Sequence, residues 1–317
     1  MTQIPALSVA IPCYNEEAGI AELHRRVTDA CRAEVGQDYE IVYINDGSRD
    51  STWDALNAVA CSDSNVVAID LARNYGHQIA LSAGLQFCRG TRILVLDADL
   101  QDPPELLPDM MRLMDQGAGV VYGQRRKRAG ETAFKKASAA FFYRFLERMA
   151  EIKIPPDTGD FRLMSRPVLD VLNAMPERNR FIRGMVSWIG MNQVPLLYDR
   201  APRFAGESNY PLGKMLRLAL DAITGFSVKP LRLASWAGFT MAIAAVLMIG
   251  YTFYGYFARG AVAGWTSLAA IVLALGSVQL FVLGVLGEYI GRLYIEAKQR
   301  PLFAVRHVTR ALPPPIA

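Results

Sequence analysis

The stretch T-R-I-L-V-L-D-A-D-L-Q-D-P-P, residues 91–104, joins an apolar run to a group of carboxylates. Residues 93–96 predict a strand, and Asp97 and Asp99 follow it at positions i and i+2. Side chains two residues apart at the end of a strand point the same way. Such hard oxygen ligands hold Mg²⁺ or Mn²⁺, which usually keep coordination positions open for phosphate groups. The alternative interpretation is a capped turn, in which Asp99 or Asp102 starts the next helix.

Apolar runs rich in β-branched residues recur through the first part of the chain, with helical patterns between them. Intervals of about twenty to thirty residues are typical of βαβ units. Segments 17–34 and 51–62 carry apolar residues at helical spacing, and Asp50 or Ser51 can cap the second segment. The pattern predicts an α/β fold with a mostly parallel sheet covered by helices. The predicted strands are the runs LSVAIPCYN from Leu7, YEIVYINDGS from Tyr39, NVVAID from Asn65, TRILVLDADL from Thr91 and GVVYGQR from Gly119.

Composition narrows the class of protein. Hydrophobic residues make up 52% of the chain, charged residues 20%, and the net charge is +4, with the apolar excess after residue 232. Basic residues gather in a few places instead of over one face, so we expect no nucleic-acid partner. We see no signal peptide and expect the first part of the chain in the cytoplasm. The four cysteines show no C-x-x-C spacing, which favours reduced thiols over zinc or disulfides.

Two uncharged runs predict transmembrane helices. Residues 235–257 and 265–287 have 23 residues each, and helices of that length reach about 34 Å, enough to cross a hydrocarbon core. The connection between them holds only Arg259. Basic residues flank the pair outside, so the positive-inside rule puts both ends in the cytoplasm. The alternative is a buried core hairpin. The flanking basic residues are Lys229, Arg232, Arg292, Lys298, Arg300, Arg306 and Arg310.

Polar strings also close the first three predicted strands. P-C-Y-N-E-E, residues 12–17, offers an aromatic face and a helix N-terminus. N-D-G-S, residues 45–48, places Asp46 where it could accept the imide N–H of uracil, although the string taken alone favours an ordinary Asp-Gly turn. R-N-Y-G-H-Q, residues 73–78, follows the third run. The chain has neither G-x-G-x-x-G nor G-x-x-x-x-G-K-[ST], which disfavours dinucleotide and P-loop sites.

Taken together, these strings resemble the family-2 nucleotide-sugar glycosyltransferases. Residues 97–105 (DADLQDPPE), 123–125 (GQR), 157–163 (DTGDFRL) and 203–210 (RFAGESNY) make the chain similar to polyisoprenyl-phosphate glycosyltransferases. Among these it looks most like the bacterial undecaprenyl-phosphate (bactoprenol) glucosyltransferases, and the dolichyl-phosphate mannose synthases are similar. The resemblance implies a GT-A fold, an inverting transfer and a divalent cation, Mg²⁺ or Mn²⁺.

The resemblance also implies roles for individual residues. The nucleotide-sugar donor would contact Pro12, Tyr14, Asn15, Glu16, Asp46, Gly76, Gln78 and Asp97. The metal would take Asp97, Asp99 and Gln101. The phosphate of the polyisoprenyl acceptor would meet Arg125, Arg128, Lys136, Ser138 and Arg203.

A phosphate acceptor changes what the protein must supply. A phosphate monoester has a second pKa near 6 and is largely dianionic at neutral pH, so it can attack the anomeric carbon without a general base. Asp157 and Asp160 are then expected to orient the sugar or an arginine, with a base role as the alternative. Segment 134–149 has aromatic residues on one side and basic residues among them, which indicates an interfacial helix or, alternatively, a core helix.

The sequence thus divides into four parts: a donor- and metal-binding core (1–165), acceptor-side and interfacial helices (166–232), a transmembrane pair (233–290) and a cytoplasmic tail (291–317). We expect transfer of a hexose, glucose from UDP-glucose, onto undecaprenyl phosphate at the cytoplasmic face of the inner membrane. The alternatives are mannose from GDP-mannose, a modified aminoarabinose from its UDP donor, or a non-catalytic membrane scaffold. A homo-oligomer is left open.

Overall fold

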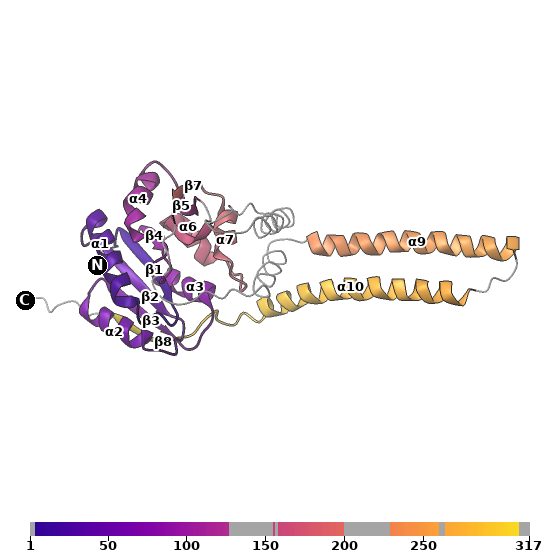
Figure 1. Cartoon of the computed structure of the whole chain (residues 1–317), viewed down its shortest axis with the longest axis horizontal. Coiled ribbons are helices and arrows are strands. Elements are labelled where there is room, and N and C mark those ends of the chain that lie inside the picture. The colour runs from indigo at the N-terminus through magenta and orange to yellow at the C-terminus, as the bar shows by residue number, and fades with distance from the viewer. Residues whose placement is uncertain (1–3, 127–154, 156–157, 200–228, 260–263, 311–317) are drawn as a thin grey trace, which may run out of the picture. The chain divides into compact units, whose positions relative to one another are not determined.

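The computed structural model describes residues 4–126, 155, 158–199, 229–259 and 264–310 (Figure 1). The chain separates into two units. The first comprises residues 1–143, 152–211 and 300–317, and the second comprises residues 144–151 and 212–299.

A mixed sheet forms the centre of the first unit. Among the described residues its strand order is β7-β5-β6-β4-β1-β2-β3-β8. The central strands β4, β1, β2 and β3 run parallel, β6 runs antiparallel between β4 and β5, and β8 runs antiparallel along β3. The strands are β1 (Leu7–Cys13), β2 (Tyr39–Asn45), β3 (Val66–Leu71), β4 (Arg92–Val95), β5 (Val120–Arg125), β6 (Thr158–Ser165), β7 (Gln193–Tyr198) and β8 (Val305–Arg310).

Helices cover both faces of this sheet, and Figure 1 shows α1 and α4 on one side of the strands and α3 and α6 on the other. Every residue of β1, β2 and β3 is buried, as expected for parallel strands between two helical layers. On the α3 side a Cβ added at Gly84 would lie 2.3 Å from Ile44 Cδ1, so this glycine permits close packing of helix on sheet. The helices are α1 (Ile20–Val35), α2 (Thr52–Ser62), α3 (His77–Phe87), the short η1 (Pro104–Leu106), α4 (Leu107–Asp115), α6 (Arg166–Ala174) and α7 (Ile182–Ile189).

The five predicted strands are confirmed, but the sheet does not end at residue 165. Strand β7 pairs in parallel with β5, and β8 pairs with β3. Strand β8 lies within the segment expected as a cytoplasmic tail (291–317), and its residues 305–310 belong to the sheet. Its sequence, VRHVTR, lacks an apolar run because five of its six residues are exposed at the sheet edge. Charged edge strands of this kind are typical of natural sheets, and they carry little strand signal.

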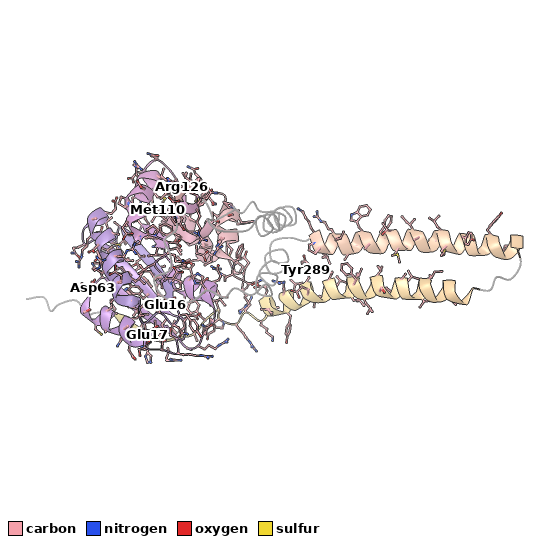
Figure 2. The ribbon with its side chains drawn as sticks, in the orientation of Figure 1. Glu16, Glu17, Asp63, Met110, Arg126 and Tyr289 are labelled. Atoms are coloured by element: carbon pink, nitrogen blue, oxygen red, sulfur yellow. The ribbon has the colours of Figure 1, made fainter. Side chains whose placement is uncertain are left out.

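Two long helices, α9 (Lys229–Arg259) and α10 (Trp265–Ala297), make up the described part of the second unit. Segments Lys229–Met248 and Ala274–Ala297 are long and apolar enough to cross a membrane. A core helix of a water-soluble protein would be mostly buried, whereas almost none of these segments is buried. Figure 2 shows their side chains projecting outward from the helices. The expected pair of candidate membrane helices is therefore present, and α10 continues past the predicted run.

Candidate functional site

Polar side chains meet beyond the carboxyl ends of the parallel strands β1, β2 and β4. These strand ends all lie on the same side of the sheet, and we call this side its carboxyl edge. This is the edge where open α/β sheets bind ligands. The loops that follow these three strands carry the predicted metal residues and most of the predicted donor residues; Pro12 lies in β1, and Gly76 and Gln78 follow β3. Strand β6 runs beside β4 in the opposite direction, so its first residues reach the same edge.

The loop after β4 holds the predicted metal ligands Asp97, Asp99 and Gln101, all of them half-buried. The backbone N–H of Gln101 donates to Asp99 Oδ1 at 3.2 Å. Between them Leu100 has a φ of +56°, in the left-handed region that a bulky residue rarely adopts. Its side chain is 2% exposed and packs in the hydrophobic core, which offsets the backbone strain. Strained backbone held in place by burial is a feature of functional loops.

A cluster of charges links this loop to α3 and β6. His77 Nε2 lies 3.4 Å from Asp97 Oδ1 and 3.2 Å from Asp160 Oδ2. Asp160 is buried, with a side chain 2% exposed, and accepts hydrogen bonds from Gln78 Nε2 at 2.8 Å and from Arg183 Nε at 2.9 Å. The sequence-predicted residues Gln78, Asp97 and Asp160 therefore do come together, joined by His77 and Arg183.

The cluster shifts the pKa values of Asp160, His77 and Asp97. Burial alone would raise the pKa of Asp160, but the charge of Arg183 and the hydrogen bond to His77 hold it well below its usual range. Burial alone would lower the pKa of His77, but the hydrogen bond to Asp160 and the charge of Asp97 raise it to about 9. Burial raises the pKa of Asp97 to about 6, and the charge of His77 opposes that rise. At neutral pH the cluster contains two carboxylates and a protonated histidine.

The donor atoms fit a divalent cation at Asp97. Ligand atoms of His77, Asp97 and Asp160 lie within 4.8 Å of one another and could hold a metal ion together, although Asp160 is also paired with Arg183. Asp97 is different: its Oδ1 is buried with no hydrogen-bond partner among the described residues, and 25% of its side chain is exposed. A carboxylate oxygen that has an ion-pair contact with His77 but no hydrogen bond, two residues from Asp99, suits Mg²⁺ or Mn²⁺.

The loops after β1 and β2 are joined to each other. The backbone N–H of Asn15 donates to Ser48 Oγ at 3.0 Å, and Arg49 N–H donates to Asn15 Oδ1 at 2.9 Å. Asn15 has a φ of +56°, and Tyr14 beside it is 39% exposed. The next residues, Glu16 and Glu17, are labelled in Figure 2. The predicted donor-binding loop is thus braced by the loop after β2 while Tyr14 stays accessible for stacking.

Asp46 has a contact that the sequence did not reveal. Its carboxylate is 3% exposed and accepts the backbone N–H groups of Tyr75 at 2.7 Å and Gly76 at 2.9 Å. Gly47 has a φ of +62°, and a Cβ added there would lie 2.5 Å from the backbone carbon of Arg73. Asp46 and Gly47 therefore fix the loop before α3, and a contact of Asp46 with uracil stays a prediction.

Arg125, at the end of β5, lies next to the loop after β4. A Cβ added at Gly159 would meet Arg125 Nη2 at 3.3 Å and Asp102 Oδ2 at 3.8 Å, so both groups flank that glycine. Asp102 is fully buried and accepts a hydrogen bond from the Tyr198 hydroxyl. Asp102 does not cap a helix, which was one of the two options in the alternative interpretation, because η1 begins two residues later at Pro104. The guanidinium of Arg125 is thus placed close to the predicted metal loop.

Comparison with known proteins identifies the family. Residues 8–172 match the model of glycosyl transferase family 2. The chain belongs to this family. This glycosyltransferase also matches the model of the GtrB C-terminal hairpin over residues 229–293, the region of α9 and α10.

Relatives match nearly the whole length of the glycosyltransferase. The uncharacterized glycosyltransferase YkcC of Bacillus subtilis is 47% identical over 300 residues, which are 94% of this chain and 93% of YkcC. The prophage bactoprenol glucosyl transferase homolog of Escherichia coli is 39% identical over 305 residues, which are 96% of this chain and 99% of the homolog. Among solved structures, that of S. aureus TarS 1–349 in complex with UDP-GlcNAc is 18% identical with a TM-score of 0.48, covering 90% of this chain and 81% of that one.

The predicted fold is confirmed: the glycosyltransferase has a mostly parallel mixed sheet, helices on both faces, and two apolar C-terminal helices. Several predicted site residues cannot be placed. Arg128, Lys136, Ser138, Asp157, Arg203 and the predicted helix at 134–149 lie outside the described residues.

Sequence reasoning missed Arg183, which completes the charge cluster. It lies on α7, 34% exposed, and its Nη1 also donates to the Thr158 carbonyl at 3.1 Å. The sequence did contain one indication of such a partner. Asp160 lies in the strand sequence TGDFRLMS, and a carboxylate buried in a strand needs a cationic partner. The sequence could not show which arginine supplies that partner, because 22 residues separate the two in the chain.

Proposed function

We propose that this glycosyltransferase transfers a hexose, glucose from UDP-glucose, onto undecaprenyl phosphate at the cytoplasmic face of a membrane, with inversion and with a divalent cation. The state of Asp160 is the observation that carries the proposal. A sugar hydroxyl as acceptor needs a base, whereas the buried Asp160 accepts several hydrogen bonds and is held ionised by Arg183. Such a carboxylate is a poor base, and a phosphate dianion needs none.

The relatives support the same acceptor. Proteins 39% identical over almost their whole length are named bactoprenol glucosyl transferases of Shigella phages. An acceptor dissolved in lipid also explains why a glycosyltransferase would carry two apolar helices with exposed faces. Trp236 is 65% exposed and Leu280 is 72% exposed, which suits lipid contact better than water.

In this proposal different residues bind the nucleotide sugar and the acceptor phosphate. Tyr14 and the braced loops after β1 and β2 would receive the nucleoside. Asp97, with Asp99 and Gln101, would hold the cation, which when bound neutralises charge on the departing diphosphate. Arg125 would hold the acceptor phosphate near the anomeric carbon. An oxygen of the acceptor phosphate then forms a bond to the anomeric carbon while the bond from that carbon to the diphosphate oxygen breaks. The first oxygen supplies an electron pair and the departing diphosphate takes one away, so no proton transfer is needed.

The first experiment assigns the reaction. Purified protein is incubated with undecaprenyl phosphate and, in turn, radiolabelled UDP-glucose, GDP-mannose and a UDP-aminoarabinose derivative, with and without a chelator. We expect glucose label in the organic phase only when Mg²⁺ or Mn²⁺ is present. Label from another donor would correct the sugar, and no label from any donor would refute the proposal.

A matched pair of variants tests the metal loop. Asp99→Ala should abolish turnover, whereas Asp109→Ala, which removes a half-exposed carboxylate paired with Arg112 on α4, should leave turnover unchanged. Near-normal activity of Asp99→Ala would remove the metal assignment.

A natural thiol reports the topology. Cys61 is exposed, while the other three cysteines are buried. A membrane-impermeant maleimide should therefore label Cys61 in inside-out vesicles but not in intact spheroplasts, with Cys61→Ser as the blank. Labelling in spheroplasts would place the catalytic unit outside the cytoplasm and contradict the proposed topology.

A further inference from the structure

Strand β8 follows the apolar hairpin, helices α9 and α10, in the sequence. It is held to the sheet of the first unit by side-chain contacts as well as by its backbone pairing with β3. β8 pairs with β3 from Val67 opposite Arg310 to Leu71 opposite Val305. Thr309 Oγ1 donates to Asn57 Oδ1 on α2 at 2.7 Å, and the ring of His307 stacks on Trp53 at 6.4 Å.

Arg306 makes the contact that matters most. Its Nη1 donates to Asp70 Oδ2 at 3.1 Å, and its Nη2 donates to the carbonyl of Ala72. The Asp70 side chain is 1% exposed, whereas that of Arg306 is 53% exposed. A carboxylate buried this deeply needs a charged partner, and Arg306 supplies one from the surface.

Asp70 connects Arg306 to the loop after β2 by a second hydrogen bond. Its Oδ1 accepts Asn45 Nδ2 at 2.7 Å, while Asn45 Oδ1 accepts the backbone N–H of Ser48 at 3.2 Å. An amide has one donor end and one acceptor end, so the carboxylate of Asp70 fixes which way the Asn45 amide faces. Turning it over would set two oxygens against each other and leave the Ser48 N–H without its acceptor.

Ser48 carries the chain of hydrogen bonds into the loop after β1. Its Oγ accepts the backbone N–H of Asn15 at 3.0 Å, and Asn15 Oδ1 accepts Arg49 N–H at 2.9 Å. Asn15 sits in a left-handed conformation with a φ of +56°, which needs such bracing to persist. One continuous path thus runs from Arg306 through Asp70, Asn45 and Ser48 to Asn15.

We propose that Arg306 is a positioning residue for the donor site: by holding Asp70 it orders the Asn45 amide and, through Ser48, the two loops that receive the nucleotide. This inference rests on the proposed function in assigning those loops to the donor. The segment downstream of the apolar hairpin would then set the affinity for the nucleotide sugar without touching it.

The same strand offers a matched control. Arg310 also approaches a buried carboxylate, with its Nη2 3.9 Å from Glu40 Oε2. Glu40 is already bound by Arg89 at 2.8 Å and by the Ser8 hydroxyl at 2.7 Å. It lies near the start of β2, at the opposite end of the strand from Asn45. Loss of Arg310 therefore removes a similar surface charge from β8 but leaves the path to the donor loops intact.

The experiment compares Arg306→Gln, Arg310→Gln and Arg306→Lys in the full chain. For Arg306→Gln we expect the KM for the nucleotide sugar to rise about tenfold, the factor that corresponds to one charge-assisted hydrogen bond. The KM for the lipid acceptor and kcat should stay near wild type. Arg306→Lys should recover part of the donor affinity, and Arg310→Gln should match wild type.

Amide hydrogen exchange without ligand gives a second readout that does not depend on catalysis. We expect faster exchange at Asn15, Ser48 and Arg49 in Arg306→Gln but not in Arg310→Gln. Equal rises in both KM values, equal effects of the two glutamine variants, or unchanged exchange would overturn the inference. An inactive wild type would instead remove the proposed function, while the exchange comparison would still decide whether Arg306 orders the loops.

Discussion

Replacing Asp160 by asparagine should destabilise the catalytic unit strongly. The change keeps the shape of the side chain but removes the charge that faces Arg183 Nε at 2.9 Å and His77 Nε2 at 3.2 Å. Removing one member of a buried pair costs about 3–5 kcal/mol, because the partner charge is left uncompensated. Arg183 is 34% exposed, so water can solvate part of it, whereas Arg162, whose Nη2 lies 3.7 Å from Asp160 Oδ1, is only 5% exposed. The lower end, about 3 kcal/mol, is therefore the smallest loss expected. For a domain of this size that equals a fall in Tm of roughly 6–12 °C.

The buried thiols of the protein provide the assay. Cys13, Cys31 and Cys88 are buried and become reactive only on unfolding, so a thiol-reactive fluorophore reports the Tm in detergent. The measurement is made in a Cys61→Ser background, which removes the exposed thiol. Asp109→Asn on α4 is the control, because an exposed ion pair contributes about 0–1 kcal/mol. If Asp160→Asn melted within about 2 °C of the control, Asp160 would not be the centre of the charge cluster.

Three further outcomes follow from the site. In chelator-treated protein the ion pairs of His77 stabilise the fold fully below the pKa of an unfolded histidine, near 6.5. This stabilisation is lost as pH rises through the folded pKa of His77, about 9. The Tm of wild type should therefore fall more between pH 6.5 and 9 than the Tm of His77→Gln. Gly47→Ala should lower the Tm more than Gly36→Ala. Both glycines have positive φ, but only at Gly47 would a Cβ also meet backbone, at 2.5 Å, so similar melting of the two would argue against a tight loop. Tyr198→Phe removes the hydroxyl that donates to the buried Asp102, which should cost about 1–3 kcal/mol of unfolding free energy, and an unchanged Tm would contradict that contact.

The sequence predicted those elements whose physics is local. The first five strands stand out because both faces of the central ones are buried, which makes them nearly continuous apolar runs. The helices α9 and α10 stand out because each contains a long run without charged residues, although these runs are exposed and not buried. Strand β8 gave no such signal because the sheet edge requires polar residues, and its pairing depends on β3, more than two hundred residues earlier in the chain.

The candidate site shows the same difference between features that depend on local sequence and features that depend on the folded chain. The position of Asp97 and Asp99 after a predicted strand was enough to place them at the ligand-binding edge. Their surroundings were not predictable, because the partners of Asp160 come from α3 and α7, and only the folded chain brings those helices to β6. Asp46 shows the same limit: its motif was readable, but its bonds to backbone amides of a later loop were not.

Because β8 follows the apolar hairpin, the catalytic sheet is interrupted in sequence. Seven of the described strands are synthesised before α9, and the eighth leaves the ribosome after α10. Until then the outer edge of β3 exposes unpaired backbone groups, which are prone to pair with other chains. A water-soluble version cut before residue 229 would keep that open edge permanently and would tend to aggregate, whereas one that rejoins residues 300–310 through a flexible linker would close it.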